Sequence, residues 1–463
     1  MARSLGIFAR PAHFSASSRP SIPVFQSLWR RKLDSMSFVR LGTTKVEKPR
    51  VKYDWIEGVE TLEEYQPGGY HPIMAGDVLH NRYHIADKLG FGGYSTVWLA
   101  RDTYLNRYVT LKISVANSIQ RETKVLKALS APTPSTSSEH PGRGLVPIFL
   151  DEFEVQGPNG EHTCYTVVPA QCNLREASFS RLFPMEVARA LSYRLAQAVA
   201  YIHSQGYVHG DVHLNNILFK LPSSFDDLSI RKFYERFGEP ETVPITRRDG
   251  EPLSPNAPTK AVVPLFIGKY AEEFSLSDAH PLLTDFGEAF SPASETRLGK
   301  DCHTPNAFRA PESKFESQMP LGYPSDIWSL ATAIWEIVGM KAIFSTDFVD
   351  GDQIAAQHID VLGPMPSEWW QHWEARSRFF DEHGYPMESY KENKWPPLEE
   401  SFETGVQKWR RKMGGEIEED EKVAFLDLMR RMLLFRPEER PTAEEVLMSD
   451  WMVKWALPDC ERR

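Results

Sequence analysis

The chain has 463 residues, of which 41% are hydrophobic and 25% are charged, a composition typical of a folded protein that can bury an active site. The longest apolar stretch, residues 329–344, has 16 residues and contains Glu336, whereas a membrane span needs roughly 20 apolar residues, so we expect a buried helix there and no membrane span. Four cysteines lie too far apart for a CxxC pair, which indicates a reducing compartment and no structural zinc site: Cys164, Cys172, Cys302 and Cys460.

Charge is distributed unevenly along the chain. Residues 1–50 hold ten of the 53 Lys and Arg but only two of the 63 Asp and Glu, which leaves 43 basic and 61 acidic residues in the rest, a net charge of −18. Such a field disfavours direct contact with nucleic acid and favours basic partners. The alternative, that this charge only aids solubility, stays open.

The first 50 residues are expected to be a basic, disordered extension. Residues 1–35 are rich in Arg and Ser, and their first acidic residue is Asp34. That composition resembles a mitochondrial transit peptide. A basic tail without a targeting role, or a start codon at Met36, are the alternatives. Folded structure is therefore expected from near Val51.

Residues 82–102 show a strand, a glycine turn and a second strand, because apolar residues alternate on both sides of the glycines. A further strand, residues 108–114, carries Lys112, whereas a Rossmann turn would open into a helix. This order suits a loop whose backbone amides cover phosphates, with Lys112 on the α and β phosphates. The nucleotide-binding residues predicted here are Leu89, Gly90, Phe91, Gly92, Gly93, Tyr94, Ser95, Thr96 and Val97.

A helix is predicted next, over residues 118–129, from the spacing of its apolar residues. It carries Glu122, ten residues after Lys112. In a kinase, such a helix supplies the Glu that pairs with the strand Lys and holds it on the phosphates. The alternative is an ordinary surface charge that pairs within its own helix.

Residues 161–174 are predicted to form a strand and a polar turn that cross between two lobes. Val168 and Ala170 would then lie against adenine. A long helix follows over residues 186–206, with Gly206 placed to cap its C-terminal end. This helix leads into the loop that carries the chemistry.

The loop VHGDVHLNN, residues 208–216, has the spacing of a phosphotransferase catalytic loop, H-R-D-L-x-x-x-N, with His209, Asp211 and Asn216 in place. Two usual positive charges are missing. Gly210 stands where Arg is usual, and His213 stands where serine/threonine kinases carry Lys. The loop therefore fits a protein kinase, a small-molecule kinase or an inactive relative.

The 68 residues between Asn216 and Asp285 are far more than a hairpin requires. Residues 221–275 include seven prolines, so we expect a largely flexible insert with a short helix near residues 225–237.

Further kinase motifs follow in order. Asp285-Phe286-Gly287 ends a short apolar strand, and its Asp is the metal-holding Asp of the kinase signature. The run at residues 310–312 is Ala-Pro-Glu, a long buried helix is predicted to start at Asp326, and Arg440 lies near the end of the chain. Each piece is weak evidence alone, but their order over residues 80–455 is strong evidence.

Together these motifs resemble those of eukaryotic protein kinases, and the details resemble the SR-protein kinases, which phosphorylate serines in Arg/Ser-rich splicing factors. Three stretches carry the narrower resemblance: YQPGGYHPIMAGDVLHNRYHIADKLGFGGYSTVWLA at 65–100, EHTCYTVVP at 161–169 and FRAPE at 308–312. The resemblance implies an α+β, bilobal protein-kinase fold. Its small β-rich N-lobe would span residues 51–170, and its helical C-lobe, interrupted by the insert, residues 171–463.

The resemblance also implies an ATP-dependent serine/threonine protein kinase that acts on basic, Arg/Ser-rich substrates such as splicing factors. It implies a monomer in the cytoplasm and nucleus. Mg²⁺ would be held by Asn216 and Asp285, and the catalytic side chains would be Asp211, as the base, with Lys112, Glu122 and His213.

By the same resemblance, His209 is structural, Glu312 pairs with Arg440, and Asp326 anchors the catalytic loop. Pro305 stands where the family has a Thr, so a contact between the neighbouring Thr304 and Asp211 stays open.

Two alternative functions remain. Many aminoglycoside and choline kinase relatives also have His-Gly-Asp followed by a His in this loop, so a small-molecule phosphotransferase is one alternative. A pseudokinase scaffold is the other, and the presence of Lys112, Glu122, Asp211, Asn216 and Asp285 argues against it.

Overall fold

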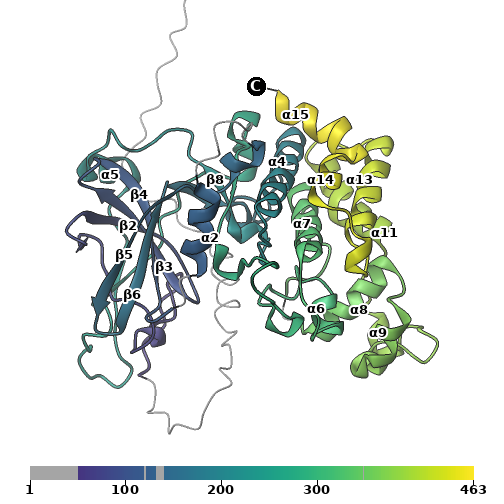
Figure 1. The fold of residues 1–463 in the computed structure, drawn as a ribbon, viewed down its shortest axis with the longest axis horizontal. Coiled ribbons are helices and arrows are strands. Elements are labelled where there is room, and N and C mark those ends of the chain that lie inside the picture. Colours follow the sequence, from purple (N-terminus) through teal and green to yellow (C-terminus); the bar gives the residue numbers. More distant parts are fainter. Residues whose placement is uncertain (1–50, 119–120, 132–139, 348, 463) are drawn as a thin grey trace, which may run out of the picture.

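The computed structural model describes residues 51–462, apart from 119–120, 132–139 and 348. It has two lobes, a sheet-rich lobe built from the first part of the chain and a helical lobe built from the rest (Figure 1). The predicted extension and targeting segment lie outside the described residues. Within the described part, no helix is long and apolar enough to cross a membrane.

A six-stranded antiparallel sheet forms the N-lobe, in the order β1-β2-β3-β4-β6-β5. The alternation along β4 explains the placement of the predicted lysine. Val109, Leu111 and Ile113 point into the lobe's core, so the half-buried Lys112 lies on the opposite face. The strands are β1 Val78–Leu79, β2 Tyr83–Gly92, β3 Ser95–Asp102, β4 Arg107–Ser114, β5 Phe149–Gly157 and β6 Gly160–Val167, and helix α2 Arg121–Ser130 accompanies them.

A small sheet lies where the chain enters the C-lobe, in the order β11-β8-β7. Its strands are β7 Ala170–Asn173, β8 Ile217–Lys220 and β11 Pro281–Leu283. Strands β8 and β11 are the two arms of the hairpin that the insert interrupts. This hairpin places the catalytic loop, before β8, beside the Asp-Phe-Gly run after β11.

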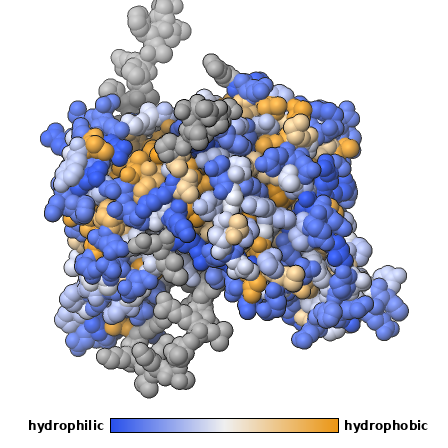
Figure 2. Space-filling model, in the orientation of Figure 1, coloured by the Kyte–Doolittle hydropathy of each residue, from blue (hydrophilic) through white to orange (hydrophobic). Residues whose placement is uncertain are grey.

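The C-lobe is built around α4 Met185–Ser204 and α7 Tyr323–Val338, whose side chains are mostly buried. Helix α7 begins three residues before the predicted start because Pro324 is tolerated in a first helical turn, and it ends before Gly339 rather than running to residue 344. The other helices are α3 Leu174–Ala177, α6 Glu312–Phe315, α8 Gly351–Leu362, α9 Ser367–His372, α10 Glu388–Lys391, α11 Leu398–Phe402, α12 Lys408–Lys412, α13 Glu419–Met432, α14 Ala443–Leu447 and α15 Leu457–Glu461. The face shown in Figure 2 is mainly hydrophilic, with small apolar groups between polar residues.

The insert differs from the expected flexible segment. It forms the predicted short helix, α5 Ile230–Phe237, and a hairpin of β9 Thr242–Pro244 and β10 Lys260–Val262. The insert begins after β8 and ends before β11, both in the C-lobe. Its helix α5 nevertheless lies beside the N-lobe sheet (Figure 1). Phe233 is fully buried there against Tyr108 of β4. The segment folds because its aromatic side chains are buried. Its proline content alone had predicted a flexible segment.

Candidate active site

Lys112 lies between two carboxylates that come from distant parts of the chain. Its Nζ is 2.8 Å from Glu122 Oε1 on α2 and 3.0 Å from Asp285 Oδ1, after β11. The backbone N–H of Phe286 also donates to Glu122. The strand lysine, the helix glutamate and the Asp-Phe-Gly run therefore meet as the sequence predicts, and Glu122 is not merely a surface charge.

These charges shift each other's protonation. Burial alone would lower the pKa of Lys112, but Asp285 and Glu122 raise it well above its usual value. The Lys112 ammonium in turn lowers the pKa of Asp285, against the effect of burial. Lysine is thus held as a cation and aspartate as an anion near neutral pH, which is the state required to bind phosphate and metal.

The catalytic loop is held by Asp326, which lies near the start of α7. Its carboxylate accepts the backbone N–H groups of His209, at 2.7 Å, and Gly210, at 2.8 Å, and also contacts His203 Nε2 at 2.9 Å. His209 Nε2 reaches the carbonyl oxygen of Thr284, next to Asp285, at 3.0 Å. The loop and the Asp-Phe-Gly run are thereby fixed to each other.

Asp211 and Asn216 are in direct contact. The amide Nδ2 of Asn216 donates to Asp211 Oδ2 and to the Asp211 carbonyl, both at 2.9 Å. This use of its N–H groups leaves the amide oxygen of Asn216 as the acceptor that can face a cation. The other carboxylate oxygen of Asp211, Oδ1, has no protein partner among the described residues.

His213 is buried and faces the same aspartate. Its Nε2 lies 3.3 Å from Asp211 Oδ2 and 3.3 Å from Asn216 Nδ2, and its ring packs against Phe308. Burial would lower the pKa of His213, but Asp211 raises it. The imidazole therefore lies beside the predicted base, and its Nε2 contacts Asp211 and Asn216 of the loop.

The glycine turn joins β2 and β3. Gly92, Gly93 and Tyr94 are exposed at its tip, and Leu89, Gly90, Phe91 and Val97 are half-buried. One predicted residue turns its side chain into the core: Thr96 Oγ1 accepts a hydrogen bond from Trp98 Nε1, and Trp98 belongs to the apolar core of the N-lobe. Ser95 is buried, and alternation along β3 puts its side chain on the opposite face, with Val97. At the crossing between the lobes, Val168 is exposed and Ala170 half-buried.

Gly210 has a left-handed φ of +77°, and a Cβ there would lie 2.9 Å from the Glu288 carbonyl oxygen. An Arg would therefore be strained at this position. Thr304 donates its hydroxyl to the Gly210 carbonyl at 2.6 Å, and no contact between Thr304 and Asp211 is seen among the described residues. Thr304 therefore contacts the backbone next to Asp211 and not the Asp211 side chain.

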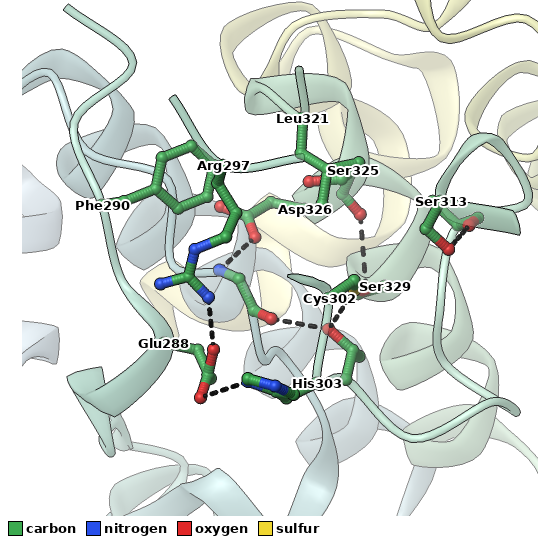
Figure 3. Close-up of a pocket in the computed structure, with 13 residues that line it drawn as sticks. Glu288, Phe290, Arg297, Cys302, His303, Ser313, Leu321, Ser325, Asp326 and Ser329 are labelled. Atoms are coloured by element: carbon green, nitrogen blue, oxygen red, sulfur yellow. Dashed lines mark hydrogen bonds and ion pairs between the residues drawn. The ribbon is translucent and has the colours of Figure 1, made fainter. Parts of the chain in front are cut away.

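The segment after Asp285 holds itself together around a small cavity of about 20 Å³, room for about one water molecule (Figure 3). On one side of this cavity the Glu288 carboxylate bridges Arg297, at 2.6 Å, and His303, at 3.0 Å. Sequence reasoning missed this bridge, because no motif spacing links the three residues.

Further into the C-lobe, Arg440 and Glu312 form a buried, bidentate ion pair with distances of 2.8 and 2.7 Å. Arg440 also donates to the carbonyl oxygens of Pro324, Leu434 and Phe435. This confirms the pairing that the resemblance implied, and it fixes the Ala-Pro-Glu run to the floor of the C-lobe.

Comparison with known proteins agrees with this geometry. A family model described as protein kinase domain matches residues 274–452. A serine/threonine protein kinase of Aspergillus fumigatus is 28% identical over 408 residues, which cover 85% of this chain and 90% of that protein. The chain is a protein kinase.

Its narrower likeness is to the SR-protein kinases. The human SRSF protein kinase 3 is 32% identical over 168 residues, covering 35% of this chain and 30% of that protein. Protein kinase dsk1 of Schizosaccharomyces pombe is 34% identical over 166 residues, covering 34% and 30%. A solved kinase domain, 18% identical, matches with a TM-score of 0.54 over 83% of this chain and 98% of that one, which supports the bilobal fold.

Proposed function

We propose that this kinase transfers the γ-phosphoryl group of ATP, with Mg²⁺, to serines of basic, Arg/Ser-rich proteins. The observation that carries the proposal is the placement of Lys112 between Glu122, at 2.8 Å, and Asp285, at 3.0 Å. In protein kinases the pairing of the strand lysine with the helix glutamate must be in place for transfer. Here the pairing of Lys112 with Glu122 is already formed within the single chain.

Each proposed role follows from a position. Lys112, held by Glu122, binds the α and β phosphates, and the backbone amides of Gly90 to Gly93 cover them. Asp211 accepts or orients the proton of the substrate hydroxyl, because its Oδ1 has no partner in the part of the chain that the structure describes, while Asn216 holds its Oδ2. Val168 and Ala170 lie at the crossing between the lobes, where adenine would pack.

The donor set fits a hard cation. The carboxylate of Asp285 and the amide oxygen of Asn216 are oxygen ligands, which Mg²⁺ prefers, and Mg²⁺ completes its shell with waters and substrate phosphates. Bound there, the ion would neutralise charge that develops on the phosphates. Lys112 keeps Asp285 ionised and so prepares it as a ligand.

Support for the substrate class comes from the relatives and from charge. One relative is named as an SRSF protein kinase, and the part of this chain after residue 50 carries a net charge of −18. Of three acids at or just before the start of α8, Asp347 is exposed, whereas Asp350 and Asp352 lie near Arg378 and Asp352 also pairs with Lys314. The acidic field of the whole body, more than this trio, therefore supports basic substrates.

A small-molecule phosphotransferase is the second candidate, since His213 and Gly210 occur in that form of the loop. The buried pair of Glu312 with Arg440 favours a peptide substrate, because it fixes the segment that forms the peptide platform of protein kinases.

One experiment separates the candidates. Purified full-length protein is incubated with Mg-ATP and, in parallel, with an Arg/Ser repeat peptide, a basic protein without such repeats, and an aminoglycoside. We expect phosphoserine on the repeat peptide. Phosphate on the aminoglycoside would favour the small-molecule reading, and no transfer to any acceptor, with unhydrolysed ATP, would favour a scaffold.

We further propose that the kinase acts as a monomer in the cytoplasm and nucleus. Imaging of a C-terminally tagged chain, with and without residues 1–35, tests this. Mitochondrial signal that disappears with residues 1–35 would show a transit peptide instead.

A further inference from the structure

The segment that precedes the kinase strands reaches the tip of the glycine turn. The hydroxyl of Tyr70 donates to the backbone carbonyl of Gly92 at 2.8 Å, and the Tyr70 side chain is 4% exposed. The two residues are 22 positions apart and belong to different segments. A buried side chain outside the turn thus holds one of the turn's own peptide groups.

The same segment also grips the strand that leads into the turn. The buried ammonium of Lys88, on β2, pairs with Glu60, and Tyr65 donates its hydroxyl to that carboxylate. The Tyr65 and Tyr70 rings pack edge to face, 5.5 Å apart. Together these residues form a block behind β2, in which the Lys88 ammonium, the Glu60 carboxylate and both tyrosine hydroxyls each have a hydrogen-bond partner.

The insert completes this block. Tyr70, Tyr65 and Tyr53 share an apolar core with Ile245 and Ala261 of the insert. Backbone bonds join the two segments, from Asp54 N to Thr246 O and from Arg248 N to Lys52 O, each 2.9 Å. A segment from the middle of the kinase sequence therefore supports the residues that contact the glycine turn.

The orientation of one peptide group links this contact to nucleotide binding. A trans peptide places its C=O and the following N–H on opposite sides, and no cis peptide occurs in the described chain. With the Gly92 carbonyl held toward Tyr70, the N–H of Gly93 points the opposite way, away from the block. Backbone N–H groups of such turns are the donors that cover phosphates.

We propose that Tyr70 is a positioning residue for the nucleotide, which acts by fixing the Gly92–Gly93 peptide so that its N–H stays available to the ATP phosphates. The inference rests on the proposed function, since it assumes that the turn binds ATP. Segments outside the kinase motifs thus organise the turn before the nucleotide arrives.

The test compares two tyrosine hydroxyls that bond to carbonyls of the same strand. Tyr70→Phe removes the bond to Gly92 and keeps the buried ring. Tyr234→Phe is the matched control, because its hydroxyl donates from the insert to the Ala86 carbonyl at the same distance, 2.8 Å, six residues from Gly92. The readouts are the Kd for ADP and for ATP by calorimetry, KM for ATP, kcat and Tm.

Loss of one neutral hydrogen bond predicts that Tyr70→Phe weakens nucleotide binding and raises KM for ATP about fivefold, with kcat at saturating ATP nearly unchanged. Tyr234→Phe should bind nucleotide like the wild type. Equal weakening in both variants, or unchanged binding in Tyr70→Phe, would overturn the inference. Failure of the wild type to bind any nucleotide would overturn the proposed function itself, and this inference with it.

Discussion

His213 Nε2 and Asp211 Oδ2 lie 3.3 Å apart, so the residue that replaces the usual loop lysine contacts the proposed base. The resemblance placed His213 among the catalytic side chains, at the position of the usual Lys. In the folded chain the ring is buried, packs on Phe308 and also reaches Asn216. His213 is therefore placed to orient Asp211, and a charged imidazole there would still add positive charge near the transferred group.

The first prediction concerns this imidazole. His213→Ala should lower kcat by at least about tenfold, since one charge-assisted hydrogen bond contributes roughly 1.5 to 3 kcal/mol. His213→Lys should restore most of the rate if positive charge is what matters. Steady-state kinetics at saturating ATP measure both. An Ala variant that turns over at the wild-type rate would mean that the ring only packs.

The second prediction concerns phosphorylation of the segment after Asp285. The Glu288 bridge to Arg297 and His303 already holds this segment. Because Gly210 stands where Arg is usual, the loop has no guanidinium at this position to bind a phosphorylated residue. Phosphatase-treated enzyme should therefore keep its activity, and Gly210→Arg should lower it because of the strained backbone. Activity lost on phosphatase treatment and regained on rephosphorylation would reveal a switch at one of the candidate sites, Ser291, Ser294, Thr296 or Thr304.

The third prediction concerns salt. A basic Ser-containing peptide should be preferred over an acidic one, and the preference should shrink between about 50 mM and 300 mM salt, because exposed charges are screened. The measurement is kcat/KM for both peptides across this range. Because the preference is attributed to the net charge of −18 spread over the part of the chain after residue 50, neutralising Asp347 alone should change it little. Equal rates on the acidic peptide at low salt would contradict the account.

The fourth prediction concerns stability and pH. Burial, with a smaller contribution from His162, lowers the pKa of His71 to about 4. The unfolded chain takes up this proton near pH 6.5 and the folded chain only near pH 4, so the free energy of unfolding should fall by up to about 3 kcal/mol as pH drops through that window. His71→Gln should lose less over the same range. Identical pH profiles of Tm for both proteins would rule out this contribution.

Much of the site could be predicted because its residues stand at fixed spacings. Lys112 follows the glycine turn on a strand with strict alternation, so its face was predictable, and Glu122 follows on the next helix. Asp211, Asn216 and Asp285 flank a hairpin, whose two arms must pair whatever lies between them. These predictions depend on motif spacing and on the resemblance to protein kinases, together with the local periodicity of the strands and helices.

The remainder depends on contacts between segments that no spacing connects. Proline content predicted a flexible insert, but Phe233 and Ile245 bury against partners supplied by β4 and by the lead-in. The contact of Tyr70 with Gly92 arises only once the lead-in, the insert and the sheet pack together. Tertiary burial thus overrides the local signal, which single-sequence reasoning cannot detect.

The most direct test of the central claim is the rate of phosphoryl transfer by Asp211→Asn, with Lys112→Met beside it. The account predicts that both variants fold with near wild-type Tm and transfer no measurable phosphate from Mg-ATP to an Arg/Ser repeat peptide, because both residues act on charge at the reacting groups. An Asp211→Asn variant that retains more than about a tenth of the wild-type kcat, a barrier change under roughly 1.4 kcal/mol, would contradict the role of Asp211 as base.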